Sequence, residues 1–257
     1  MPRSTYLART VVVGALLALA APGIAQGEHS STHQTYSELS NLPDFSGVWT
    51  GASGRAPVNP VLTPAAQTGL DAFRAKQEAE GVAQEAQIRC LPPGMPNIMR
   101  QPYPHEFLFT PGRVTILTET YTQARRIYTD GRELPDDPDF LFNGTSVGRW
   151  EGQTLVVDTV GFSPLVTYLA GVTHGEQMRI QERMWLEQPD LMVIETTITD
   201  PGVLAEPLVT RASYRREPTW EIREYVCEEN NRLTADEGGA NLDLDFDPDD
   251  PFGPPPE

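Results

Sequence analysis

The chain has 257 residues and a formal net charge of −17. Such an acidic protein is poorly matched to the phosphates of nucleic acids or to an anionic membrane surface, so neither is expected as a partner. Between two terminal segments of unusual composition, the length suits one domain with a substantial core.

The first 26 residues, MPRSTYLARTVVVGALLALAAPGIAQ, are typical of a secretory signal peptide. Two arginines supply the basic start, residues 10–21 are almost wholly apolar, and Gly23 and Ala25 suit a cleavage site. The apolar run is too short for a membrane span, which needs about 20 residues. We therefore expect residues 1–25 to be removed, the protein to be periplasmic or secreted, and no membrane insertion; a membrane-anchored N-terminus is the alternative.

The next segments predict a leader, a strand and a helix. Residues 26–43 are polar and predict a flexible leader, and DFSGVWTGA (44–52) predicts the first strand. One clear helix follows, because Thr63 can cap it, Pro64 suits its first turn and Gly81 can end it.

The two cysteines of the chain are Cys90 and Cys227. Cys90 begins a Pro-rich segment (90–104) that is not expected to be regular structure. In an oxidising compartment an even pair predicts a disulfide, worth on the order of 5 kcal/mol in the chain-entropy model. Neither cysteine has another Cys or a His at ligand spacing, so no metal site is predicted.

From Glu106 onward the hydrophobic pattern has a period of two residues. Short turn signals separate many of the segments, which favours antiparallel neighbours. About ten such strands must close into a barrel or split into two sheets. We therefore predict a mainly β fold, an antiparallel meander closing into a barrel or sandwich, within a single domain (44–232) carrying one peripheral helix. The predicted strands are 106–110, 113–121, 124–130, 146–152, 153–160, 178–188, 190–199, 208–217 and 219–229.

The C-terminal segment, residues 233–257, is acidic and rich in proline. Its DLDFDPDD run spaces carboxylates as calcium loops do, but it lacks the glycine and the final glutamate of an EF-hand loop. We therefore expect a disordered, solvated tail.

Two motifs, RRIYTDGR (125–132) and GRWEGQTLVVDTVGF (148–162), carry a resemblance. With a DFSG-x-W start, a C-x-P-x-G-x-P segment and a late EY-x-C-x-EN, the sequence resembles a broad group of uncharacterised exported bacterial proteins. The resemblance spans nearly all of residues 44–232 and implies membership rather than a chemistry. Separately, SGVW (46–49) resembles the G-x-W start of lipocalin-type barrels, and small barrels of this type can hold one ligand.

Alternation along residues 124–130 places Arg126, Tyr128 and Asp130 on one face and Arg125 on the other. An arginine fork with a tyrosine donor can hold a carboxylate or a phenolate. The alternative is cross-strand pairing with acids such as Glu119, and we favour such a structural pair for Arg125.

Two histidines are predicted near loops and close to acids in the sequence. His174 lies in a predicted loop with Glu176, and His105 follows another predicted loop and precedes Glu106. Histidine suits general acid–base work when a carboxylate orients it, and loops at a barrel mouth often carry such groups. The alternative is a surface histidine. A zinc site built from both histidines and an acid has no supporting spacing motif.

Three acids lie on otherwise apolar strand faces: Glu182, Glu224 and Asp158. A carboxyl group in an apolar pocket can act as a general acid or base. The alternative is a structural ion pair with an arginine of a neighbouring strand.

The sequence carries no nucleophile elbow, phosphate loop, dinucleotide fingerprint or cofactor lysine, so no cofactor is expected. The leading hypothesis is an exported barrel enzyme performing acid–base chemistry (a lyase, isomerase or hydratase) on a small apolar or aromatic molecule. The alternative is a non-catalytic, lipocalin-like carrier or sensor, and the discriminating test is whether His174, Tyr128 and Glu224 line one cavity. The candidate catalytic residues are His174, His105, Tyr128 and Glu224, and the candidate binding residues are Arg126, Asp130, Glu182, Asp158 and Trp150.

Overall fold

The computed structural model describes residues 35–52, 59–80, 90–169 and 171–227, with the backbone of residues 233–236 and 239–242. The predicted signal peptide (1–25) lies outside these residues. Among the helices of the described chain, none is long and apolar enough to cross a membrane.

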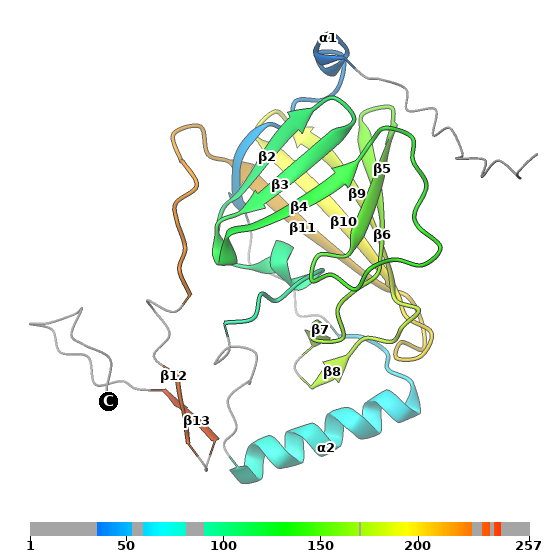
Figure 1. Ribbon diagram of the computed structural model, residues 1–257, viewed down its shortest axis with the longest axis vertical. Helices are drawn as coiled ribbons and strands as arrows, with labels where there is room; N and C mark the ends of the chain where they lie inside the picture. The colour runs from blue at the N-terminus through cyan, green and yellow to red at the C-terminus, as the bar shows by residue number, and fades with distance from the viewer. Residues whose placement is uncertain are drawn as a thin grey trace, which may run out of the picture.

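Nine strands form a closed barrel, in the order β1-β11-β10-β9-β6-β5-β4-β3-β2 (Figure 1). The mainly β barrel predicted from the period-two pattern is confirmed. Closure leaves no free sheet edge, since β1 pairs with both β2 and β11. The barrel strands are β1 Gly47–Gly51, β2 His105–Thr110, β3 Arg113–Thr118, β4 Gln123–Tyr128, β5 Thr145–Glu151, β6 Thr154–Val160, β9 Arg179–Gln188, β10 Leu191–Thr199 and β11 Leu208–Arg216.

The expected antiparallel meander is interrupted at one seam. Strands β4 and β5 pair in parallel, Ile127 opposite Ser146 and Tyr128 opposite Val147. A parallel neighbour requires the chain to return to the same end of the sheet, and the long loop 129–144 provides that return. A second departure is the hairpin of β7 (Thr167–Leu169) and β8 (Val172–Thr173). It follows β6 and precedes β9 in the sequence, and it forms a separate two-stranded sheet outside the barrel order.

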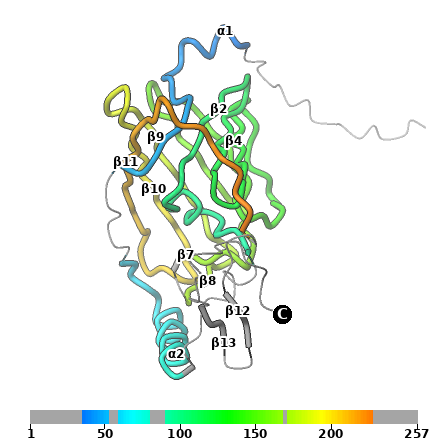
Figure 2. The backbone as a smooth tube through the Cα atoms, turned by 90° about the vertical axis from the view of Figure 1, so that its left-hand side faces the viewer, coloured from blue at the N-terminus to red at the C-terminus, as the bar shows by residue number. Residues whose placement is uncertain are grey.

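The prediction of a last strand at 219–229 is wrong over its described part. Residues 217–227, the strap, are not a strand, and in Figure 2 this orange segment crosses the outside of the barrel. The reason is that β1 already occupies the edge of β11, so no strand position is left for the strap. Trp220, which lies on this segment, is 52% exposed.

The strap is fixed to the rest of the chain by the predicted disulfide, which is confirmed between Cys90 and Cys227 with a Cα–Cα distance of 5.8 Å. Its Arg223 N–H also donates to Glu119 Oε2 (2.9 Å). The ring of Tyr225 lies 5.5 Å from that of Tyr103, whose hydroxyl pKa is raised first by burial and then by Tyr225 itself.

The predicted helix is confirmed as α2 (Pro64–Glu80), and its Thr63 cap accepts the Ala66 N–H at 3.3 Å. Gly81, the expected stop, lies outside the described residues. The helix lies at the end of the barrel beside β8 (Figure 1), where Leu70 is buried in the core.

The Pro-rich segment at 90–104 contains one regular turn, the 3-10 helix η1 (Asn97–Arg100). Its Ile98 and Met99 are buried in the core, and the Tyr214 hydroxyl donates to the Met99 carbonyl (2.6 Å). Gly94 has a φ of +63°, and a Cβ there would lie 2.4 Å from the Phe142 carbonyl oxygen, so glycine is required at this approach.

Short elements also occur in the two segments predicted to be irregular. The leader holds α1 (Tyr36–Leu39), and the tail backbone pairs as β12 (Leu233–Asp236) with β13 (Gly239–Leu242). A second 3-10 turn, η2 (Thr120–Thr122), connects β3 to β4. The leader and the tail were predicted to be irregular from their composition, and composition does not predict local hydrogen bonding of this kind.

Replacing both cysteines by serine (Cys90→Ser with Cys227→Ser) is expected to lower the free energy of unfolding by about 2–5 kcal/mol. The bridge joins residues separated by 137 positions, so its loss returns much chain entropy to the unfolded state. Urea unfolding measures the change. Dithiothreitol should produce the same loss in the wild type and none in the variant; equal stability of variant and wild type would contradict a structural role.

Candidate functional site

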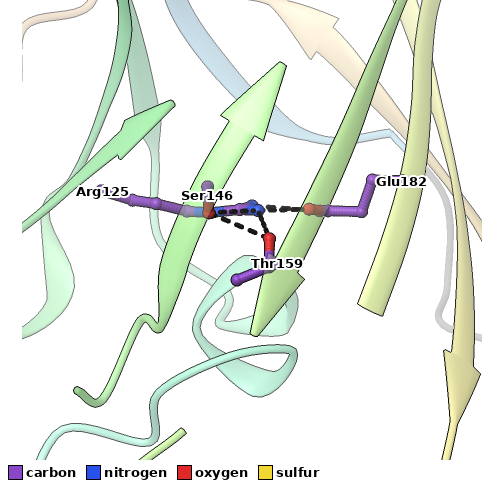
Figure 3. Close-up of polar contacts among 4 residues, drawn as sticks. All are labelled: Arg125, Ser146, Thr159 and Glu182. Atoms are coloured by element: carbon purple, nitrogen blue, oxygen red, sulfur yellow. Dashed lines mark hydrogen bonds and ion pairs between the residues drawn. The ribbon is translucent and has the colours of Figure 1, made fainter. Parts of the chain in front are cut away.

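A polar cluster lies inside the barrel around Arg125 of β4 (Figure 3). Its Nη1 donates to Glu182 Oε1 (3.1 Å) and its Nη2 pairs with Glu182 Oε2. The same guanidinium donates to Ser146 Oγ at 3.3 Å and to Thr159 Oγ1 at 3.1 Å. The two side chains of the ion pair are 2% and 1% exposed, so this is a buried, hydrogen-bonded pair.

The cluster joins four strands, because Ser146 comes from β5, Thr159 from β6 and Glu182 from β9. Arg125 therefore bridges the parallel seam between β4 and β5 from within. A buried charge is tolerated only when it is paired and hydrogen-bonded, and this one meets both conditions. The contacts of Arg125 join β4 to β5, β6 and β9, so the cluster supports the barrel, and its Thr159 also lines a groove of about 670 Å³.

The inward position of Glu182 is confirmed, and its ion pair with an arginine of another strand is the structural alternative considered for it. The choice of Arg126 as the inward arginine is wrong: Arg126 is exposed, and Arg125 faces the core. Alternation separates the two arginines correctly, but the motif RRIYTDGR contains no signal that indicates which face lies inside.

The other members of the motif form a turn on the outside. The Arg132 guanidinium lies 3.8 Å above the Tyr128 ring, and its Nη2 donates to Asp130 Oδ2 at 2.6 Å. This hydrogen bond from Arg132 holds the pKa of the Asp130 carboxyl below its usual range, against a smaller opposing effect of burial. Tyr128 and Asp130 are thus occupied with a partner of the chain itself.

His105 is fully buried inside the barrel. Its Nδ1 lies 3.1 Å from Thr118 Oγ1, and its ring meets the Tyr214 ring edge-on at 5.7 Å. Trp150 is also a packing residue, with its ring 5.5 Å from Phe45. Both residues therefore contribute to the core.

Two predicted acids lie on the outside. Asp158 faces outward from β6, where Oδ2 accepts from Arg149 (2.6 Å) and Oδ1 from Gln181 (2.8 Å). Its expected place on an apolar inner face is wrong, because Thr159, its neighbour, is the one that points inward. Glu224 is exposed on the strap, so its predicted inward position is wrong as well.

His174 directly follows β8 in the sequence. Its side chain lines a pocket of about 180 Å³. Its Nε2 is 2.7 Å from the Ser163 carbonyl oxygen and its Nδ1 2.9 Å from that of Gly175. A carbonyl oxygen only accepts, so the nitrogen that carries the proton donates to the main chain and the other nitrogen faces a second carbonyl oxygen. The lining residues are Phe140, Phe162, Pro164, His174, Gly175 and Glu176.

The backbone beneath His174 is positioned by Asp200, a residue that the sequence patterns did not single out. Asp200 is buried, and its Oδ2 accepts the Gly175 N–H at 2.7 Å. A Cβ at Gly175 would lie 2.7 Å from Asp200 Oδ1, so a larger residue there would displace the Asp200 carboxylate. The His-Gly pair at 174–175 is the one signal in the sequence that marks this tight position.

The structure does not bring together the four predicted catalytic residues. His174 lines the pocket of about 180 Å³, whereas His105 is buried in the core. Tyr128 packs against Arg132 on the outside, and Glu224 is exposed on the strap. In the described part of the chain, no group of three or more His, Cys, Asp and Glu side chains is placed to hold a metal ion. The aromatic walls of the pocket, Phe140 and Phe162, were not foreseen.

Neither a family model nor a curated protein matches this sequence. Among solved structures, the chain is similar to a point mutant of the fluorescent protein UnaG, at 14% sequence identity. That match covers 67% of this chain and 96% of the other, with a TM-score of 0.33. The class of the fold, a closed nine-stranded barrel, rests on the strand pairing itself.

Glu182→Gln is expected to lower the free energy of unfolding by about 3–5 kcal/mol, because it leaves the Arg125 charge buried without a counter-charge. Replacing both partners (Arg125→Met with Glu182→Leu) should recover most of that loss. Urea unfolding of the two variants measures both values.

The matched control is Arg126→Gln, an exposed arginine on the same strand, which should change stability by no more than about 0.5 kcal/mol. A loss below about 1 kcal/mol in Glu182→Gln would show that Arg125 reaches water and would contradict the closed cluster.

Arg132→Gln is expected to raise the pKa of Asp130 towards that of a free aspartate, because it removes the hydrogen bond that lowers this pKa. Because the folded-state pKa is depressed, the pair stabilises the fold above the unfolded pKa and this contribution is lost as the pH falls through the folded pKa. The pair is partly exposed, so the effect on stability should stay below about 1 kcal/mol. A carboxyl ¹³C NMR titration checks the shift; Arg126→Gln should leave it unchanged, and an unaltered titration in Arg132→Gln would refute the assignment.

Proposed function

We propose that this protein binds a small aromatic or apolar molecule in the pocket beside His174, as a carrier or sensor. The side walls, Phe140 and Phe162, are aromatic, and Pro164 adds a third apolar surface. A volume of about 180 Å³ suits a single-ring molecule, since an apolar cavity of about 150 Å³ admits benzene.

The mouth of the pocket supports the same proposal. Phe140, Leu141 and Leu165 are 67%, 48% and 51% exposed, so large apolar side chains gather on the two loops that form it. These loops are joined by main-chain hydrogen bonds, from the Ser163 N–H to the Leu141 carbonyl (2.9 Å) and from the Leu141 N–H to that of Gly161 (3.0 Å). A site already held in place loses little entropy on binding.

The contacts of His174 are the observation that favours binding over catalysis. A general base needs a nitrogen facing the proton that it removes. Both nitrogens of His174 face main-chain carbonyl oxygens instead, and the ring packs edge-on against Phe162 at 6.0 Å. His174 therefore serves as a fixed wall, and Glu176 offers one polar group at the margin of the pocket.

We further propose that the protein is exported and belongs to the group of exported bacterial proteins that its motifs resemble. The Cys90–Cys227 disulfide supports an oxidising compartment, because cytosolic thiols are kept reduced.

The test uses phenol, indole and cyclohexanol as probes, with binding followed by ligand-observed NMR. Phe140→Ala should weaken binding of the aromatic probes about tenfold, since it removes a large apolar contact. The matched control is Val209→Ala, another exposed apolar residue that does not line the pocket.

Equal binding by Phe140→Ala and the wild type, or no binding of any probe, would reject this site. Conversion of a bound compound by the wild type, lost in His174→Gln while binding persists, would replace the binding proposal by an enzymatic one.

A further inference from the structure

We propose a second binding site, on the outside of the barrel, for a small carboxylic acid that carries several hydroxyl groups, as sugar acids do. A groove of about 670 Å³ runs over the outer face of β5, β6, β9 and β10. Its wall is Gly131–Leu134, the start of the long loop seen beside β5 in Figure 1. Volumes of about 300–1,000 Å³ are typical of small-molecule sites.

The floor of the groove is a row of outward side chains across four neighbouring strands. Val147 stands opposite Asp158, Asp158 opposite Gln181, and Gln181 opposite Thr197. Strand rigidity fixes these side chains relative to one another, as a preformed site requires.

Three of the five charged residues that line the groove are paired, whereas Glu133 is exposed and has no ion pair or hydrogen bond with a described residue. Arg149 is bound to Asp158 at 2.6 Å and Arg132 to Asp130 at 2.6 Å. Arg179, in contrast, is exposed and forms no ion pair or hydrogen bond with any described residue. A guanidinium in this position favours a carboxylate, which it can hold through two parallel hydrogen bonds.

Hydroxyl groups of the ligand would meet the remaining polar atoms. Thr199 stands opposite Arg179 across the β9–β10 pair, and Thr197 lies two residues before it on the same face. Within the described chain, neither threonine hydroxyl makes a hydrogen bond, and Gln181 uses only its amide nitrogen, towards Asp158. A ligand without hydroxyls would leave these groups unpaired, which lowers its affinity.

Two apolar side chains complete the floor: Val147 and Val160. They offer contact to the C–H face of a hydroxylated ring, while Arg179 and the threonines hold its polar edge. Apolar contact, hydroxyl partners and one unpaired cation together define the ligand class more narrowly than any one of them.

The groove is independent of the His174 pocket, because the two share no lining residue. Failure of one site would therefore leave the other untouched.

Isothermal titration of the full-length protein with D-glucuronate, D-glucose and acetate tests the proposal. Glucuronate should bind at least about tenfold more tightly than glucose, which lacks the carboxylate, or acetate, which lacks the hydroxyls. Arg179→Gln should weaken glucuronate binding about tenfold or more, and Thr197→Val should weaken glucuronate but not acetate.

The matched control is Arg126→Gln, an exposed arginine of the barrel surface that does not line the groove; it should leave glucuronate binding unchanged. Phe140→Ala should also leave it unchanged. The site is refuted if glucuronate does not bind at millimolar concentration, if glucose binds as well, or if Arg179→Gln has no effect.

Discussion

The buried ion pair between Arg125 and Glu182 reinforces the barrel from inside, next to its one parallel seam. The β4–β5 seam is the one place in the barrel where strands pair in parallel, and it is short, with Ile127–Ser146 and Tyr128–Val147 as its partners. Parallel pairing is slightly weaker per residue than antiparallel pairing. Arg125 compensates from inside, since its contacts reach β5, β6 and β9 at once. The seam is therefore held by side chains where the main chain contributes least.

Much of the architecture could be predicted because its causes are local. Period-two alternation predicts every barrel strand except β1, eight of the nine. Thr63 and Pro64 predict the start of α2. The strap shows the limit of this reasoning: its alternation is as good as that of β11, yet β1 already pairs with the edge that it would need. Competition between segments for one edge is decided by the whole sheet and leaves no local trace.

The candidate sites were harder to foresee for the same reason. Alternation separated Arg125 from Arg126, but only the closed barrel determines which of them meets Glu182. The pocket beside His174 requires the loops at 138–144 and 161–166 to lie together, and the parallel bridge between Leu141 and Phe162 joins them. Asp158 and Glu224 were recognised as acids on apolar strand patterns, but both lie on the outside and not on an inner face. Pattern thus identified the residues with unusual chemistry, and tertiary pairing determined their surroundings.

The Cys90–Cys227 bridge distinguishes β1 from the other eight barrel strands. Eight of its strands, β2 to β6 and β9 to β11, lie between the two cysteines and so belong to one closed covalent ring, whereas β1 lies before it. A single backbone cut inside the ring would leave both fragments linked through sulfur. A cut between β1 and Cys90 would instead leave β1 attached by hydrogen bonds and packing alone, chiefly through Trp49, which is fully buried. Of the nine barrel strands, β1 is therefore the one that a single cleavage can make exchangeable for another strand.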